Sequence, residues 1–143
     1  MTALENVILP LELDGVSRMV AAAKGRRALE AMEIDDLAEE GADRLSVGEQ
    51  QLVAVARGMV GDRRILLADE PTAALDRAGA DLVVRQLARV AKEGSGVLMV
   101  THSAEQAAWA DRVIALQDGR LVDDLEETGP ACAHQDPARE RQP

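Results

Sequence analysis

The chain has 143 residues, of which 47% are hydrophobic but only 1% aromatic, so it can bury one ordinary core built from aliphatic side chains. Sixteen basic and twenty-six acidic residues give a net charge of −10, which repels phosphate backbones and argues against nucleic-acid binding. The single cysteine, Cys132, excludes an internal disulfide, and no apolar run approaches the roughly 20 residues that span a bilayer. We therefore expect a soluble, cytoplasmic chain.

The amino-terminal third is predicted to be mainly helical after an irregular start. Residues 1–16 mix apolar residues with Pro10, and we expect a short extended or irregular segment there. A helix is expected over 17–32, with Ser17 as its N-cap. The acidic segment 33–44 follows, and it predicts a surface loop or a broken helix.

The stretch "SVGEQQLVAVARGMV" carries a strong helix-start signature. Ser46 is followed three residues later by Glu49, which is the spacing of a capping box, and apolar residues then continue to Val60. Because residues 52–56 are apolar in succession, we expect this helix to be buried on most sides.

Three short apolar runs follow, over 64–69, 96–102 and 112–117, separated by helix-like stretches over 77–94 and 103–111. This alternation of strand and helix patterns is typical of a parallel sheet in an α/β fold.

The finer patterns in this part refine the expected fold. Helical spacing predicts that the first crossover helix buries one apolar face, formed by Leu82, Val83, Leu87 and Val90. Ser103 and Gln106 offer a second capping box. "GRLVDD" follows a "QDG" turn and is expected to form an antiparallel strand. We expect a helical subdomain over 1–60, an α/β core over 61–125 and a disordered tail over 126–143.

The first apolar run, "ILLAD", ends in two adjacent carboxylates, Asp69 and Glu70. The carboxyl ends of parallel strands face the ligand crevice of an open α/β sheet. One carboxylate suits a hydrated Mg²⁺, and the other can act as general base on water. His102 ends the next run and is expected at the same edge. The alternatives are a solvated acidic turn and a surface histidine; His134, in the tail, is read as such a residue.

The "LSVGEQ" turn can bind an anion, because the first N–H groups of a helix lack partners within the helix. Taken alone, the turn is better interpreted as a well-capped helix without a ligand. The order of the three signals, turn, acidic strand end and histidine strand end, is more specific than any one of them.

In that order, "LSVGEQQLVAVARGMV", "RILLADEPTAALD" and "VLMVTH" resemble the signature motif, the Walker B motif with D-loop, and the H-loop of the ATP-binding domains of ABC transporters. The resemblance covers Met1 to about Asp124. "TALENVILPLELDGVSR" and "LLADEPT" further resemble the branch that serves lipoprotein release and macrolide export.

The resemblance implies part of a P-loop NTPase fold of RecA type, with a parallel sheet and a helical signature subdomain. It implies that Asp69 organises Mg²⁺, that Glu70 is the general base and that His102 is the switch histidine. Nucleotide held by an opposing subunit would be contacted through the signature residues and the D-loop aspartate, namely Ser46, Val47, Gly48, Glu49, Gln50 and Asp76. The implied cofactors are ATP and Mg²⁺.

The chain departs from the family pattern at three places. The phosphate-binding sequence GxxxxGK[ST] is absent, and Val47 and Leu52 stand where the family has glycine and arginine. The missing loop would supply amides and a lysine to the β- and γ-phosphates. We therefore expect the C-terminal part of a nucleotide-binding domain, truncated and inactive by itself.

Three functions follow from this interpretation. The first is an ATPase subunit of an ABC transporter, which pairs with a second ATP-binding subunit and with membrane permease subunits, peripheral on the inner face of the cell membrane. The second is the C-terminal lobe of a chromosome-maintenance or DNA-repair ATPase, against which the net charge of −10 argues. The third is a non-enzymatic remnant or docking module.

Overall fold

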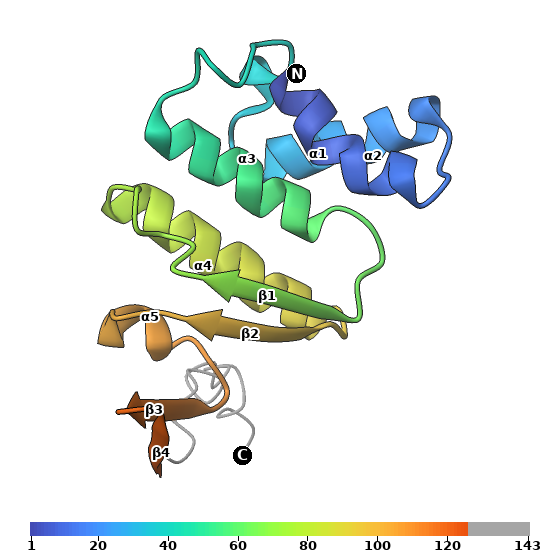
Figure 1. The fold of residues 1–143 in the computed structure, drawn as a ribbon. Helices are drawn as coiled ribbons and strands as arrows, with labels where there is room; N and C mark the ends of the chain where they lie inside the picture. Colours follow the sequence, from blue (N-terminus) through green and yellow to red (C-terminus); the bar gives the residue numbers. More distant parts are fainter. Residues whose placement is uncertain (126–143) are drawn as a thin grey trace, which may run out of the picture. The chain divides into compact units, whose positions relative to one another are not determined.

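The computed structural model describes residues 1–125 as two compact units, Met1–His102 and the unit that begins at Ser103 (Figure 1). The elements of the first unit are α1 (Ala3–Leu13), α2 (Arg18–Ala31), the short 3₁₀ helix η1 (Asp35–Leu37), α3 (Val47–Met59), β1 (Ile65–Asp69), α4 (Arg77–Lys92) and β2 (Gly96–Val100). Those of the second are α5 (Ala104–Ala107), β3 (Val113–Gln117) and β4 (Arg120–Leu125). The tail expected over 126–143, with Cys132 and His134, lies outside the described residues.

The expectation of a short extended or irregular segment over 1–16 is wrong, because most of these residues form helix α1. Thr2 and Glu5 make a capping box: Glu5 N donates to Thr2 Oγ1 at 3.1 Å and Thr2 N donates to Glu5 Oε2 at 3.0 Å. A proline inside a helix costs about 3 kcal/mol, whereas each fully buried Val, Leu or Ile contributes about 1.5–3 kcal/mol. The buried face of α1 consists of Ala3, Leu4, Val7, Ile8 and Leu11. Burial along this face therefore outweighs the cost of Pro10.

Helices α1, α2 and α3 pack on one another and supply most of the buried core residues. The helix expected from residue 17 is present as α2, with Ser17 at the N-cap position but without a side-chain capping bond. Gly25 lets α2 approach α1 closely, because a Cβ atom there would lie 2.9 Å from Leu4 Cδ1 and even closer to Ile8 Cγ2. Val7, Ile8, Leu29 and Met32 are at most 1% exposed.

Helix α3 begins as expected, with Ser46 as N-cap of a complete capping box. The expectation that it is buried on most sides is wrong. Only Val53 and Ala56 are fully buried within it. Its exposed residues recur every three or four positions, at Val47, Gln50, Ala54 and Arg57. The helix is therefore amphipathic, because its apolar residues meet the neighbouring elements on one side only.

Strands β1 and β2 form a two-stranded parallel sheet, joined by the crossover helix α4 as the sequence predicted. Leu82, Val83 and Leu87 of α4 are buried, and Val90 is half-buried. A continuous apolar run in a parallel strand is typical of burial on both faces, but the burial of β1 alternates along the strand. Inner-face residues, Leu66 among them, pack against the core, whereas Ile65 and Leu67 on the outer face are 69% and 71% exposed.

The third apolar run does form a strand, β3, but it joins a different sheet. Among the described residues, β3 pairs only with β4, in an antiparallel hairpin that confirms the expected turn at "QDG". The segment between β2 and β3 contains one four-residue helix, α5, whereas α4 has 16 residues. The expectation of three strands in one parallel sheet therefore holds for two.

The described residues contain no helix that is long and apolar enough to cross a membrane. The boundary expected after residue 60 falls inside the first compact unit, so the division into a helical subdomain and an α/β core remains a prediction.

Candidate functional site

The carboxyl end of β1 presents Asp69 and Glu70. Asp69 is the last residue of the strand and is exposed. Glu70 follows in the left-handed region with φ of 43°, and its N–H donates to Val100 O at 2.9 Å. A non-glycine residue in this region costs about 1–3 kcal/mol and persists only where its surroundings enforce it. Such strain is concentrated at functional sites, which makes Glu70 a candidate.

His102 lies directly beside Glu70. Its Nε2 atom is 3.3 Å from Glu70 Oε1, and its imidazole is 95% exposed. Glu70 Oε1 is buried and has no hydrogen-bond partner among the described residues, since the 3.3 Å approach of His102 does not have hydrogen-bond geometry. A buried carboxylate oxygen without a donor is costly. Adjacent parallel strands thus bring the two side chains together, while their chemical roles stay predictions.

The turn that opens α3 is held by the capping box. Ser46 N and Ser46 Oγ both donate to Glu49 Oε2 at 2.7 Å, and Glu49 N donates back to Ser46 Oγ at 3.3 Å. The hydrogen bond from the Ser46 hydroxyl, followed by that from its N–H, holds the pKa of Glu49 below its ordinary 4.5. The N–H groups of Val47 and Gly48 have no carbonyl within the helix, so they are the donors that an anion would meet.

Gln50 and Asp76 have structural contacts in this chain. Gln50 Nε2 donates to the carbonyl oxygens of Ala42 and Leu45, at 3.0 and 3.1 Å. Asp76 is the N-cap of α4, and its Oδ1 accepts from Gly79 N at 2.8 Å. Their predicted contacts with nucleotide are therefore additional to these roles.

The predicted site residues form two groups that the segment 70–76 connects. Glu70 and His102 lie at its start. At its other end, Ala74 lies against the signature turn, because a Cβ atom at Gly48 would be 3.4 Å from Ala74 O. Gln51, which the sequence analysis did not single out, joins α3 to this segment through a hydrogen bond from Nε2 to Pro71 O at 2.9 Å. No sequence signal marks that bond, since its partners are 20 residues apart.

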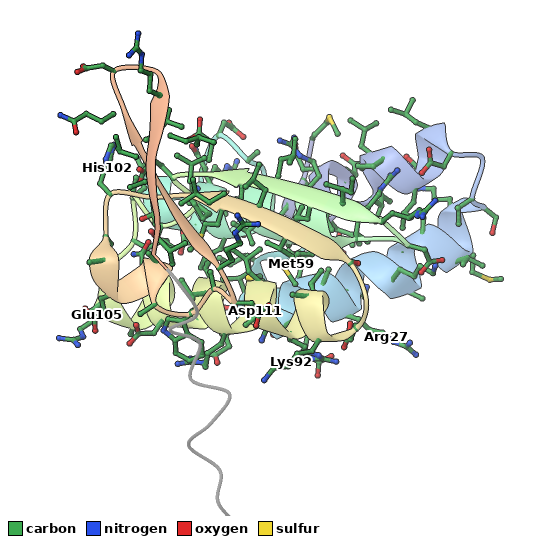
Figure 2. The ribbon with its side chains drawn as sticks, turned by 90° about the horizontal axis from the view of Figure 1, so that it is seen from below. Arg27, Met59, Lys92, His102, Glu105 and Asp111 are labelled. Atoms are coloured by element: carbon green, nitrogen blue, oxygen red, sulfur yellow. The ribbon has the colours of Figure 1, made fainter. Side chains whose placement is uncertain are left out.

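The acidic strand end fits a weakly held, hydrated Mg²⁺ better than a closed metal site. No group of three or more metal-ligating side chains occurs within residues 1–125. Mg²⁺ commonly takes one or two carboxylates and completes its shell with water and phosphate oxygens, and the exposed carboxylate of Asp69 can supply one such ligand. Neither of the two lysines lies at this end of β1. Lys24 pairs with Asp62 at 3.8 Å, and Lys92 ends α4 far from His102 (Figure 2).

Comparison with known proteins places this geometry in a family. Residues 1–73 match the ABC transporter family. The chain is 42% identical over 132 residues to the macrolide export ATP-binding/permease protein MacB 1/2 of Paracoccus denitrificans, covering 92% of this chain and 20% of that protein. It is 42% identical over 121 residues to the lipoprotein-releasing system ATP-binding protein LolD 2 of Caulobacter vibrioides, covering 84% of this chain and 53% of that protein.

A solved structure is similar throughout most of the fold. The dimeric, post-hydrolysis ATP-binding cassette MJ0796 bound to ADP and Pi superposes with a TM-score of 0.82 at 33% identity, covering 90% of this chain and 57% of that one. The chain thus spans about half the length of the LolD relative and of this cassette. These matches do not favour the DNA-repair alternative. The chain belongs to the ABC transporter family, as an α/β chain of the ATP-binding cassette fold in the branch that contains LolD and MacB.

Proposed function

We propose that this chain provides the acidic half of the ATPase site in an ABC transporter subunit, with Glu70 as the general base. One observation carries the proposal. Glu70 Oε1 is buried without a hydrogen-bond partner among the described residues, next to His102, at the carboxyl end of a parallel strand. An acceptor in this state is suited to take a proton from a water molecule.

The residues around Glu70 have distinct proposed tasks. When bound, ATP supplies the reactive terminal phosphoryl group, and Mg²⁺ offsets its negative charge. Asp69 holds the cation through its exposed carboxylate, and Glu70 accepts the proton of the attacking water. His102 Nε2, 3.3 Å from Glu70 Oε1, can donate a hydrogen bond to an oxygen at this edge and so orient the water.

The signature turn is proposed to serve the nucleotide of a second subunit. The N–H groups of Val47 and Gly48 face outward from the first turn of α3 and carry the positive end of the helix dipole. Ser46 could join them only by turning its hydroxyl away from Glu49 Oε2, to which it now donates at 2.7 Å. Glu49 and Gln50 would hold the turn in shape, and Asp76 would act from the start of α4.

The proposed assembly is a pair of ATP-binding subunits on membrane permease subunits, at the inner face of the cell membrane. The similar cassette MJ0796 is described as dimeric. The MacB relative is named as an ATP-binding/permease protein. Both support the proposal for this chain without identifying what it transports.

The test uses this chain alone and the same chain joined behind an amino-terminal cassette segment that contains GxxxxGK[ST]. We expect negligible ATP hydrolysis by the first and turnover by the second. Glu70→Gln should lower kcat of the joined protein by about 10²–10⁴-fold, the usual contribution of a general base. The matched control is Glu93→Gln, since Glu93 lies after α4 in an exposed pair with Arg89 at 2.9 Å. Undiminished turnover of the Glu70→Gln protein would contradict the proposal.

A further inference from the structure

We infer that Gln51 is a positioning residue for Glu70, and that it ties the acidic end of β1 to the helix that carries the signature turn. The inference rests on the proposed function of Glu70. Gln51 Nε2 donates to Pro71 O at 2.9 Å, and the bond is partly buried. It lies beside an open hollow of about 180 Å³ whose lining includes Gln51, Asp69 and Pro71.

The bond matters because of where Pro71 stands. Glu70 has φ of 43°, and a residue before proline is restricted further by the proline ring. On the amino side of this bend, Glu70 N is fixed by Val100 O at 2.9 Å. On the carboxyl side, Gln51 fixes the Pro71 carbonyl. The backbone that aims the Glu70 carboxylate is therefore held from both sides, once by the sheet and once by α3.

The same helix touches the segment 70–76 at a second point. Gly48, one turn before Gln51, lies against Ala74 O, since a Cβ atom there would be 3.4 Å away. Ser46 caps this helix, so the signature turn and Gln51 belong to one hydrogen-bonded element. A shift of the signature turn, as when it receives an anion, would therefore pull on Pro71 as well. Gln51 is placed to transmit that shift to Glu70.

A purely structural bond would stabilise the fold without affecting the chemistry, and Ser95 provides that comparison. Ser95 Oγ donates to Arg63 O at 2.7 Å, so it also fixes a main-chain carbonyl next to β1, but at the opposite end of the strand. Gln51→Met and Ser95→Ala each remove one side-chain donor to a backbone carbonyl. Only the first removes it beside Glu70.

The first measurement uses the 143-residue chain itself. Ala73 N donates to Glu70 O at 3.2 Å, so its hydrogen exchange by NMR reports the bend at Glu70. We expect Gln51→Met to speed the exchange of this amide at least tenfold, while amides of α1 and α2 keep their rates. Ser95→Ala should leave Ala73 unchanged. Equal exchange of Ala73 in the Gln51→Met and unsubstituted chains would overturn the inference.

The second measurement uses the joined protein described above. Gln51→Met should lower kcat at least tenfold and leave KM for Mg²⁺–ATP within twofold, because Gln51 positions Glu70 and does not touch nucleotide. Gln51→Glu, which keeps the shape but loses the donor, should do the same, and Ser95→Ala should match the parent. If Glu70→Gln abolishes turnover but both Gln51 variants keep full kcat, the inference alone is wrong. If Glu70→Gln keeps full turnover, the proposed function itself fails.

Discussion

The three-helix region α1–α3 and the two-stranded sheet β1–β2 belong to one compact unit. They differ in how completely their apolar side chains are buried. Val7, Ile8, Leu29 and Met32 in the helical region are at most 1% exposed. The outer face of the sheet, by contrast, leaves Ile65, Leu67, Leu98 and Val100 between 52% and 71% exposed. The helices cover one another, whereas the described residues of this unit cover the sheet on its inner face only.

The reason lies in the geometry of the two kinds of element. An amphipathic helix has one apolar stripe, which a single neighbouring pair of helices can cover. A strand in a parallel sheet is apolar on both sides, so the sheet needs a layer on each face. The described residues supply α3 and α4 for the inner face. Stability should therefore depend on the helical region, and the outer face should govern association with other apolar surfaces.

The largest expected change in the free energy of unfolding comes from truncating a buried leucine of the helical region, compared with an exposed leucine of the sheet. Leu29 is fully buried and Leu67 is 71% exposed. Leu29→Ala should lower the free energy of unfolding by about 2–5 kcal/mol through lost burial and a cavity. Leu67→Ala should change it by less than about 1 kcal/mol. Urea denaturation followed by circular dichroism measures both, and equal losses would show that the two regions do not differ as described.

A smaller effect is expected from helical glycines. A Cβ atom at Gly25 would clash with Ile8 Cγ2, whereas at Gly58 it would lie 3.3 Å from the flexible end of Leu66. Gly25→Ala should therefore destabilise the fold by about 1–2 kcal/mol through overpacking. Gly58→Ala should be neutral or stabilise by up to about 1 kcal/mol, because alanine favours the helix. Thermal unfolding distinguishes them, and stabilisation by both would contradict the close approach of α1 and α2.

The capping box of α3 should give a pH-dependent effect. The pKa of Glu49 is held below 4.5 by the Ser46 hydroxyl and N–H, so the folded state favours its ionised form. That contribution is present above pH 4.5 and is lost as the pH falls through the folded pKa. Glu49→Gln should lower the urea midpoint slightly at pH 7, and the gap should close at lower pH. A gap that widens on acidification would reverse the assigned sign.

The smallest change in stability should come from the outer face of the sheet, where association is affected instead. Leu67 and Leu98 are register partners on neighbouring strands. Leu67→Glu combined with Leu98→Lys places opposite charges side by side and removes exposed apolar area. We expect unchanged circular dichroism with weaker binding of an apolar dye and less self-association in size-exclusion chromatography. Unchanged dye binding would show that the outer face of the sheet is not the surface that binds apolar molecules.

Structural features that depend on residues close together in the sequence were easier to predict than features that depend on distant ones. The starts of α2 and α3 follow from local patterns, and the capping box at Ser46 formed as expected. Pro10 argues locally against helix α1, but the capping box at Thr2 and Glu5 is an equally local signal in its favour. The exposure of Leu67 could not be read from an apolar run, because it depends on which layers cover the sheet.

The same distinction holds for the candidate site. The meeting of Glu70 and His102 was predictable, because parallel strands align their carboxyl ends. The contact between Gln51 and Pro71 was not, because it depends on how α3 packs against a turn 20 residues away. The motif residues were therefore easier to find than the residue that we infer positions them.

At position 70 the backbone conformation favours glycine, whereas the proposed chemistry requires a carboxylate. A glycine adopts φ of 43° without the penalty of a Cβ atom, so Glu70→Gly should relieve a cost of roughly 1 kcal/mol or more. The same exchange deletes the only carboxylate that meets His102 within the described residues. A screen for thermostability alone would therefore select the glycine, and a screen for turnover would reject it.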